Sequence, residues 1–333
     1  MHCWIIICFM QKAYGEDCIM NKMRYLCSII WEVIIINFQE LKQKDKAVFD
    51  SFFKADYYEN SHFTFTNLFM WRKPYHMEWC VEDGILFLKS KWETDEFILQ
   101  PFGPQGKMQL AIKKLVDYFS AIGKPLIFYG LEKRMADELE KFPDAKFNII
   151  EDRDNFDYVY SSEDLIYLRG RKFHSKKNHL NNFRKNYPNA QYIPITDEVI
   201  TLCKLTVNGW YKTRSQDMPD DPFIAAERDA IIEVLNNFAD LALKGGAVIN
   251  DGRIIAFTFG EQLNTDTAVI HVEKADPDIN GAYTFINQAF VLNEWQNMKF
   301  INREEDMGID GLRKAKESYR PVKMIKKYNA EIK

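Results

Sequence analysis

Three consecutive strand-like segments, followed by an amphipathic helix and a short strand, constrain the fold of this chain more than any other feature. The strand-like segments are Gly246 to Asn250, Arg253 to Gly260 and Thr267 to Val272. Asn250-Asp251-Gly252 joins the first two and favours a two-residue hairpin turn. Phe285, Ala289 and Leu292 then keep helical spacing. This order predicts an antiparallel meander, a helix over about 282–298 and a strand over 300–302.

The residues before this meander continue an alternation of helices and strands. We expect a basic helix over about 171–187 and a strand over 191–195. Two further helices each place apolar residues on one face. The first has Ile200, Cys203, Val207 and Trp210, and the second has Ile231, Leu235, Phe238 and Ala242.

The first half of the chain shows a weaker form of the same plan. A hairpin at Glu82-Asp83-Gly84 joins strands over about 77–81 and 84–90. Apolar spacing predicts helices around 41–52, 108–122 and 135–142, with a strand over 125–129 between the last two. Residues 146–160 are strand-like, and a domain boundary is expected near residue 155.

The size of the chain agrees with two domains. It has 333 residues, of which 47% are hydrophobic, which is enough apolar material for two cores of ordinary size. We therefore expect a degenerate N-terminal domain over 37–155 and a C-terminal domain over 156–333 that carries the site. Residues 1–36 match neither pattern and are interpreted as an N-terminal extension or a start codon assigned too far upstream.

Charge and cysteine content narrow the class further. The net charge of −4 gives no global signal for nucleic acid, so any basic site is local. Apolar runs near the N-terminus are too short to span a bilayer, and Glu16 and Asp17 interrupt a signal-peptide pattern. The six cysteines form neither a disulfide framework nor a zinc pattern. We expect a cytoplasmic protein without an integral membrane segment and without a metal site.

The order of the predicted elements and three longer segments of the sequence resemble those of a known protein family. The segments are Leu168-Arg-Gly-Arg-Lys-Phe-His-Ser-Lys-Lys-Asn-His-Leu-Asn-Asn-Phe183, His271-Val-Glu-Lys-Ala275 and Asn302-Arg-Glu-Glu-Asp-Met-Gly-Ile-Asp-Gly-Leu-Arg-Lys-Ala-Lys-Glu-Ser-Tyr-Arg-Pro321. Over about 37–333 the chain resembles an uncharacterised bacterial family similar to the C-terminal domain of phosphatidylglycerol lysyltransferase. That resemblance implies an α/β fold of two tandem Gcn5-related N-acyltransferase-like domains. It also implies kinship with enzymes that move an aminoacyl group from tRNA, including the Fem peptidyltransferases.

The resemblance to acyltransferases raises the question of coenzyme A. In members that use it, a loop with small residues presents backbone N–H groups to the pyrophosphate at a helix N-terminus. The equivalent stretch here starts at Asn280 and Gly281, but Tyr283 and Phe285 fill positions that should be small. We therefore expect no cofactor, with acetyl-CoA or another acyl-CoA serving only under an alternative function.

The basic segment is the second candidate site. Six of its cations are candidate phosphate contacts, and no acidic residue lies among them: Arg169, Arg171, Lys172, Lys176, Lys177 and Arg184. One interpretation is a solvated helix face. The other is a surface that binds phosphates of tRNA or an anionic lipid headgroup, with a strong salt dependence for RNA.

Candidate catalytic residues follow the meander. His271 and Glu273 are two apart on a strand and should share one face, where they could take a proton from an acceptor amine or form a structural hydrogen-bonded pair. Downstream, Asp306 is a candidate base, while Arg313 and Lys316 are candidates to offset oxyanion charge. Surface ion pairs are the alternative for this mixed-charge segment.

Trp210 and Arg214, near the end of one helix, could stack on a base or a headgroup, although core packing is favoured for Trp210. No Gly-x-Ser-x-Gly, P-loop, His-Glu-x-x-His or Cys-x-x-Cys motif occurs. Three functions remain. They are aminoacyl transfer from tRNA to an amine or lipid acceptor, coenzyme-A-dependent N-acyl transfer, and binding without chemistry.

Overall fold

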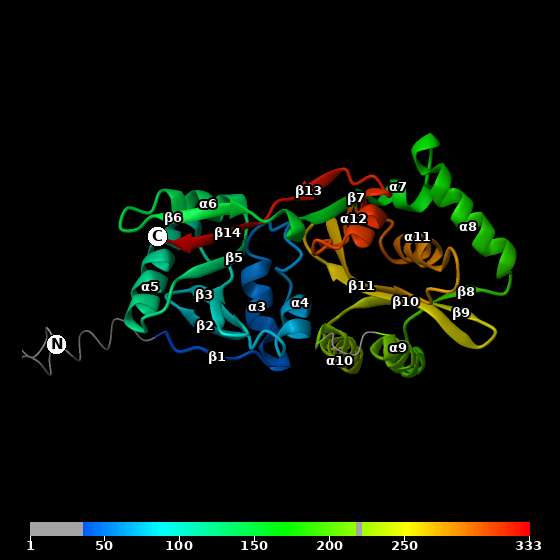
Figure 1. Cartoon of the computed structure of the whole chain (residues 1–333), viewed down its shortest axis with the longest axis horizontal. Helices are drawn as coiled ribbons and strands as arrows, with labels where there is room; N and C mark the ends of the chain where they lie inside the picture. Colours follow the sequence, from blue (N-terminus) through cyan, green and yellow to red (C-terminus); the bar gives the residue numbers. More distant parts are fainter. Residues whose placement is uncertain (1–35, 218–221) are drawn as a thin grey trace, which may run out of the picture.

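The computed structural model describes residues 36–217 and 222–333. They form two mixed α/β lobes that lie side by side, each around a seven-stranded sheet (Figure 1). The α/β class with mixed sheets expected from the sequence is confirmed.

The first lobe is built around the sheet β1-β2-β3-β4-β5-β14-β6. Its strands are β1 (Gln39–Glu40), β2 (Glu78–Glu82), β3 (Ile85–Trp92), β4 (Asp95–Ile98), β5 (Ile127–Leu131), β6 (Phe147–Glu151) and β14 (Tyr328–Ile332). Its helices are α3 (Lys46–Phe53), α4 (Phe65–Trp71), α5 (Met108–Ala121) and α6 (Lys133–Glu140).

The second lobe is built around the sheet β13-β7-β12-β11-β10-β9-β8. Its strands are β7 (Asp157–Ser161), β8 (Gln191–Pro194), β9 (Lys244–Asn250), β10 (Arg253–Gln262), β11 (Thr267–Ala275), β12 (Phe300–Asn302) and β13 (Lys323–Ile325). Its helices are α7 (Ser162–Tyr167), α8 (His174–Asn186), α9 (Asp197–Asp217), α10 (Pro222–Asn236), α11 (Ala282–Glu294) and α12 (Asp310–Glu317).

Both lobes follow one plan, which local sequence explains. Each has a three-stranded antiparallel meander, then a helix, then a strand parallel to the last strand of the meander. The expected hairpin turns carry Asp-Gly pairs with positive φ, at 52° and 72° for Asp83 and Gly84 and at 47° and 77° for Asp251 and Gly252. Positive φ at both central positions matches the twist of the flanking strands.

The two lobes exchange one strand each. β7 leaves the first half of the chain and lies between β12 and β13 of the second sheet, and β14 returns from the C-terminus to lie between β5 and β6 of the first (Figure 1). The sequence-based division placed 156–333 together, whereas residues 328–332 belong to the first sheet. Short strands such as β13 and β14 lack a pattern long enough to indicate their partners.

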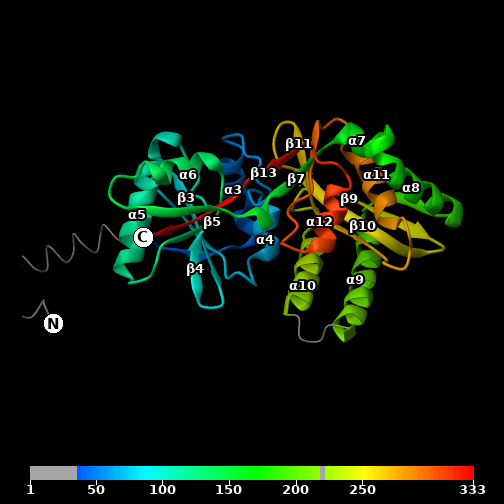
Figure 2. The same cartoon turned by 45° about the horizontal axis from the view of Figure 1, so that its top comes forward.

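The apolar packing is not divided as the sheets are. α5 and α6 cover one face of the first sheet, and α7 and α11 cover one face of the second. On the other faces, α3 and α4 of the first lobe join α9 and α10 of the second in a single cluster, which includes Phe69, Ile231 and Phe257. Figure 2 shows α9 and α10 side by side in the second lobe. The expectation of two separate cores therefore fails on this side.

Candidate functional site

A β-bulge positions His271. In the pairing of β10 with β11, Phe259 lies opposite Val272 and Gly260 opposite Ile270, so His271 is the extra residue. A Cβ on Gly260 would lie 2.1 Å from the carbonyl oxygen of Val269, so only glycine fits there. Bulges bend a strand and redirect a side chain, and they are frequent next to active sites.

The bulge also separates His271 from Glu273. Ile270 packs with the helices on the α11 side of the sheet, whereas Val272 packs in the cluster shared by the lobes. These residues would share a face in a regular strand, so the alternation is inverted between them. The sequence-based expectation that His271 and Glu273 share one face is therefore wrong, because it assumed a strand without a bulge.

Beyond the bulge, β11 and β12 diverge. Their parallel pairing ends at Val269 and Asn302. From there, side chains alone join the two segments. His271 Nδ1 lies 2.9 Å from Glu304 Oε1, and Arg303 Nη2 donates to Glu273 Oε1 at 2.8 Å. We call this region the splay.

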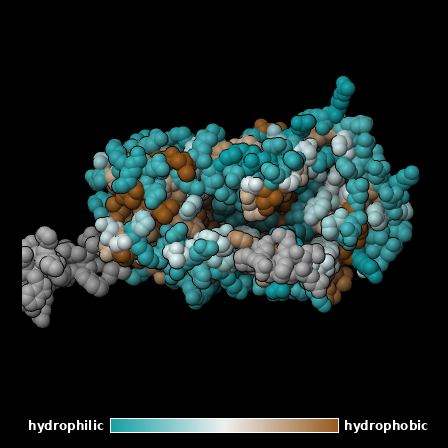
Figure 3. Space-filling view, viewed as in Figure 1, coloured by the Kyte–Doolittle hydropathy of each residue, from teal (hydrophilic) through white to brown (hydrophobic). Residues whose placement is uncertain are grey.

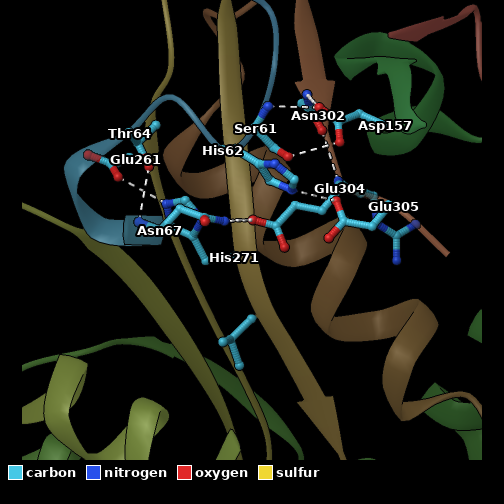
Figure 4. A network of polar contacts seen from close by, with 12 residues as sticks. Ser61, His62, Thr64, Asn67, Asp157, Glu261, His271, Asn302, Glu304 and Glu305 are labelled. Atoms are coloured by element: carbon cyan, nitrogen blue, oxygen red, sulfur yellow. Dashed lines mark hydrogen bonds and ion pairs between the residues drawn. The ribbon is translucent and has the colours of Figure 1, made fainter. Parts of the chain in front are cut away.

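His271 is enclosed between two carboxylates. Its Nε2 lies 3.0 Å from Glu261 Oε1, and its side chain is 1% exposed (Figure 4). Glu304 also accepts a hydrogen bond from Asn67 of α4 at 3.3 Å, which links this group to the first lobe. Burial alone would lower the pKa of His271, but Glu261 and Glu304 outweigh it and raise the pKa to about 9. His271 is therefore a buried cation near neutral pH.

A second buried group lies where the exchanged strands meet. Lys327 Nζ lies 2.7 Å from Asp157 Oδ1 and 3.1 Å from Glu305 Oε2, and both Lys327 and Asp157 are 0% exposed. His62 Nε2 lies 3.0 Å from the same nitrogen. Asp157 also accepts from the side chain of Ser61 at 2.8 Å and from Asn302 at 2.9 Å. Burial opposes the charge on Lys327, yet Asp157 and Glu305 raise its pKa.

Glu273 lies on the α11 side of the splay in a separate group. Besides Arg303, it accepts a hydrogen bond from Asn287 Nδ2 at 2.8 Å. The guanidinium of Arg303 lies 4.7 Å from the ring centre of Tyr319, and Lys176 Nζ lies 4.0 Å from the same centre. The pair of Glu273 and Arg303 is nearly buried, at 10% and 13% side-chain exposure.

Lys316 connects the two sides of the splay. It is buried and donates to the carbonyl oxygens of Arg303 and Glu304, the latter at 3.1 Å. Burial and the neighbouring charge of Arg303 lower the pKa of Lys316 to about 8. Its two carbonyl contacts hold Glu304, which has a positive φ of 57°, in a conformation unusual for this residue type.

Asp306 is buried and forms an ion pair with Arg313, whose side chain is 28% exposed. Arg313 donates to both carboxylate oxygens, at 2.9 and 2.7 Å, and Tyr158 donates at 2.6 Å. Burial would raise the pKa of Asp306, but Arg313 and Tyr158 hold it well below the usual range. All of its contacts within the described chain anchor the segment after β12, so Asp306 is placed to fix that segment.

The candidate phosphate contacts fall into three groups. Arg169 and Lys172 pair with Glu163 and Asp164, at 2.9 and 2.8 Å, because α7 supplies acidic partners that the basic segment itself lacks. Lys176 is half-buried and turned toward Tyr319. The exposed members are Arg171, Lys177 and Arg184, and Arg184 donates to Gln288 at 3.0 Å.

The remaining candidates lie around the start of α11 and the end of α9. Asn280 Oδ1 lies 3.2 Å from His179 of α8. A Cβ on Gly281 would lie 2.5 Å from the carbonyl oxygen of His179, so α8 closes over this helix start. Trp210 packs on Phe257 with ring centres 6.0 Å apart. Arg214 is exposed and 3.5 Å from Glu227.

Sequence reasoning missed several residues of the site. The missed side chains are Ser61, His62, Asn67, Asp157, Glu261, Asn287, Arg303, Tyr319 and Lys327. They come from segments far apart in the chain, and no local spacing connects them. Lys327 lies among other charged residues, including Lys326 and Glu331, so its local sequence did not distinguish it.

The described residues contain neither a membrane-spanning helix nor a cluster of metal-binding side chains. No helix in 36–217 or 222–333 is long and apolar enough to cross a membrane. Within the same ranges, no cluster of three or more His, Cys, Asp or Glu side chains could hold a metal ion. The face in Figure 3 is mostly hydrophilic and is hollowed near its middle.

Two lobes with the same meander, helix and parallel strand, and a polar group in the splay of the second, define a tandem acyltransferase-like protein. The chain belongs to the family described as phosphatidylglycerol lysyltransferase, C-terminal, whose model matches residues 56–331. The family resemblance and the tandem Gcn5-related N-acyltransferase-like fold expected from the sequence are thereby confirmed.

Solved structures agree with this assignment. A conserved protein of unknown function from Bacteroides thetaiotaomicron has a TM-score of 0.83 and 37% identity, over 90% of this chain and 100% of that chain. L-PGS from Bacillus licheniformis has a TM-score of 0.64 and 14% identity, over 89% of this chain and 93% of that chain. The latter identity shows a shared fold alone.

A curated relative is less informative. An uncharacterized protein of Mycoplasmoides gallisepticum is 27% identical over 175 residues. The match spans 53% of this chain and 56% of that relative, which is about half the length of each.

Proposed function

We propose that this protein transfers an aminoacyl group from tRNA to an amine or lipid acceptor, and that the second lobe carries the site. The observation that supports this most is the position of α8. The helix borders the splay, and Arg171 in the turn just before it and Lys177 on it are exposed, with no hydrogen bond or ion pair to any described residue. Unpaired cations beside a polar site suit an RNA backbone.

In this proposal the aminoacyl ester lies in the splay. Arg303 and Lys316 stand beside one another there and would offset negative charge on the ester oxygen. His271 is charged near neutral pH and is held by two carboxylates, so it suits positioning of Glu304 better than proton abstraction. Glu273 orients Arg303 through their ion pair.

Coenzyme-A-dependent transfer is the alternative from the sequence, and the packing at the start of α11 weighs against it. Gly281 is covered by His179, and Phe285 packs on Phe183 with ring centres 4.7 Å apart. A pyrophosphate needs free backbone N–H groups at such a helix start. Calorimetry with acetyl-coenzyme A tests this point, and we expect weak binding or none. Micromolar affinity would favour the alternative.

Salt-dependent tRNA binding tests the main proposal. Arg171→Ala combined with Lys177→Ala should weaken binding and reduce the salt slope of log affinity by about 0.7 to 0.9 for each lost phosphate contact. A matched control is Lys54→Ala with Lys113→Ala, which removes two exposed lysines of the first lobe. We expect the control to bind as the wild type does.

Transfer is measured separately, with tRNA charged with a radiolabelled amino acid and amine or lipid acceptors. Binding with transfer supports the proposal, and binding without transfer to any acceptor favours a binding protein on the same fold. No tRNA binding at low salt overturns the aminoacyl proposal.

A further inference from the structure

Arg303 has a buried donor without a partner. Its Nη2 donates to Glu273 at 2.8 Å, but no described residue accepts a hydrogen bond from its buried Nη1. Buried polar groups in native proteins are nearly always paired, and an unpaired donor costs about 1 to 3 kcal/mol. A guanidinium N–H group that is buried without an acceptor therefore indicates that a bound ligand supplies the acceptor.

Lys176 brings a second cation to the same place. It reaches from α8 over Tyr319, at 4.0 Å from the ring centre, while Arg303 lies 4.7 Å from that centre. Among described residues no carboxylate lies within 4.0 Å of Lys176 Nζ. Burial and the charge of Arg303 lower the pKa of Lys176 to about 8. An incoming anion would relieve both effects.

The local charge is positive. Lys176, Arg303 and Lys316 lie near one another, since the charge of Arg303 acts on both lysines. Glu273 is the carboxylate in contact with Arg303. Glu304, Glu305 and Asp157 also act on Lys316, so the unbalanced cations are Lys176 and Arg303, with Glu273 as the carboxylate near both. Two close cations with one carboxylate favour a further negative group.

A hydrogen-bond acceptor completes the group. Asn287 donates through Nδ2 to Glu273 at 2.8 Å, and its buried Oδ1 has no partner in the described chain. Arg303 and Asn287 therefore flank one carboxylate, each with an unused polar atom. One offers N–H donors for an anionic oxygen, and the other accepts from a hydroxyl group.

We propose that Arg303 and Lys176 bind the phosphate group of a small phosphate ester on the α11 side of the splay, and that Asn287 accepts a hydrogen bond from a neighbouring hydroxyl of that ligand. Arginine suits phosphate because its guanidinium stays charged and donates charge-assisted hydrogen bonds, here from the unpaired Nη1. The inference rests on the proposed function only in taking the ligand to be part of a substrate.

Calorimetry at low salt and pH 7 tests the site with the full chain. Glycerol 3-phosphate and 5′-AMP present the phosphate ester with a hydroxyl on two different frames, and inorganic phosphate lacks that hydroxyl on carbon. We expect Lys176→Ala to weaken binding of the tighter ester by about tenfold, the loss of one charge-assisted contact. Lys185→Ala, at an exposed lysine of the same helix, should change it by less than about twofold.

The binding results distinguish the ester site, the Asn287 contact and the proposed function from one another. If neither ester binds the wild type, or if Lys176→Ala binds as tightly as the wild type, the site is overturned. If inorganic phosphate binds as tightly as both esters, the Arg303 and Lys176 contacts stand and the Asn287 contact falls. Ester binding without tRNA binding would support the ester site and overturn the proposed function. Binding of tRNA without ester binding would overturn the ester site and leave the proposed function supported.

Discussion

Most polar contacts of the site involve consecutive residues that begin with Asn302 at the end of β12. Asn302 contacts Asp157, Arg303 contacts Glu273, and Glu304 contacts His271. The five consecutive side chains from Asn302 to Asp306 thus enter four groups, because Asn302 and Glu305 share the one around Lys327. Lys316 makes this arrangement possible, because it binds two carbonyl oxygens of the segment and fixes the positive φ of Glu304.

The first prediction concerns the charge of His271. Its folded pKa of about 9 lies above the value of about 6.5 expected in the unfolded chain. The resulting stability, up to about 3 kcal/mol, is fully present below pH of about 6.5 and is lost as pH rises through about 9. We expect His271→Gln to lack this component, as measured by urea unfolding across that range.

The comparison must be made as a difference between variant and wild type. Lys176 and Lys316 have pKa values of about 8, below that of an unfolded lysine, so their contribution to stability rises with pH over the same range. His174→Gln, at an exposed position, is the control. Equal pH dependence in His271→Gln and wild type would show that His271 is not charged in the folded protein.

For single residues, the sequence indicated which side chains belong to the site better than it indicated which side chains they contact. His271, Glu273 and Lys316 were singled out, and each lies at the splay. Their partners could not be derived, because Glu304 reaches His271 and Arg303 reaches Glu273 only after the distant strands β11 and β12 pair. Lys172 has no acidic residue in its own basic segment, but it pairs with Asp164 of α7 in the folded protein.

The strands β11 and β12 position these side chains through a bulge and through the end of their pairing, more than through regular strand geometry. The bulge in β11 inverts the alternation of side chains, and the end of the β11 and β12 pairing opens the splay. Long periodic elements such as α5 and the β9 to β11 meander matched the sequence pattern. α4, β4, α12 and β13 did not, since each is short or follows turn-like residues.

The second prediction tests the bulge. Gly260→Ala would place a Cβ 2.1 Å from the carbonyl oxygen of Val269, so the strands must separate. We expect a loss of about 1 to 3 kcal/mol in the free energy of unfolding, and a pKa of His271 shifted from about 9 toward its ordinary value. Urea unfolding and NMR titration measure the two effects.

Gly209→Ala is the matched control for this substitution. Gly209 lies in α9, and a Cβ there would have open space. Alanine in an exposed helix position should stabilise the protein by up to about 1 kcal/mol. If Gly260→Ala behaves like Gly209→Ala and leaves the pKa of His271 unchanged, the bulge does not position this side chain.

The whole molecule is held together by the exchange of β7 and β14. Each half of the chain ends in a strand that completes the other sheet, so neither sheet is formed by one half alone. The apolar cluster shared by α4 and α10 adds a second connection. A sequence repeat indicates two similar halves but carries no signal for such an exchange, because each half could equally well keep its own last strand.

The last prediction concerns the ion pair where the exchanged strands meet. Asp157 begins β7, Lys327 immediately precedes β14, and both are fully buried at a separation of 2.7 Å. Lys327→Met keeps the volume and removes the charge, which leaves Asp157 and Glu305 without their cation. Breaking a buried pair on one side costs about 3 to 5 kcal/mol, because the remaining charge is desolvated and unpaired.

Lys326→Met is the control, since its pair with Glu151 is about half exposed and worth at most about 1 kcal/mol. Urea unfolding followed by both circular dichroism and tryptophan fluorescence should show a single lowered transition for Lys327→Met, because the shared apolar cluster still couples the lobes. A loss no larger than that of Lys326→Met would mean that the strand exchange, and not this ion pair, holds the lobes together.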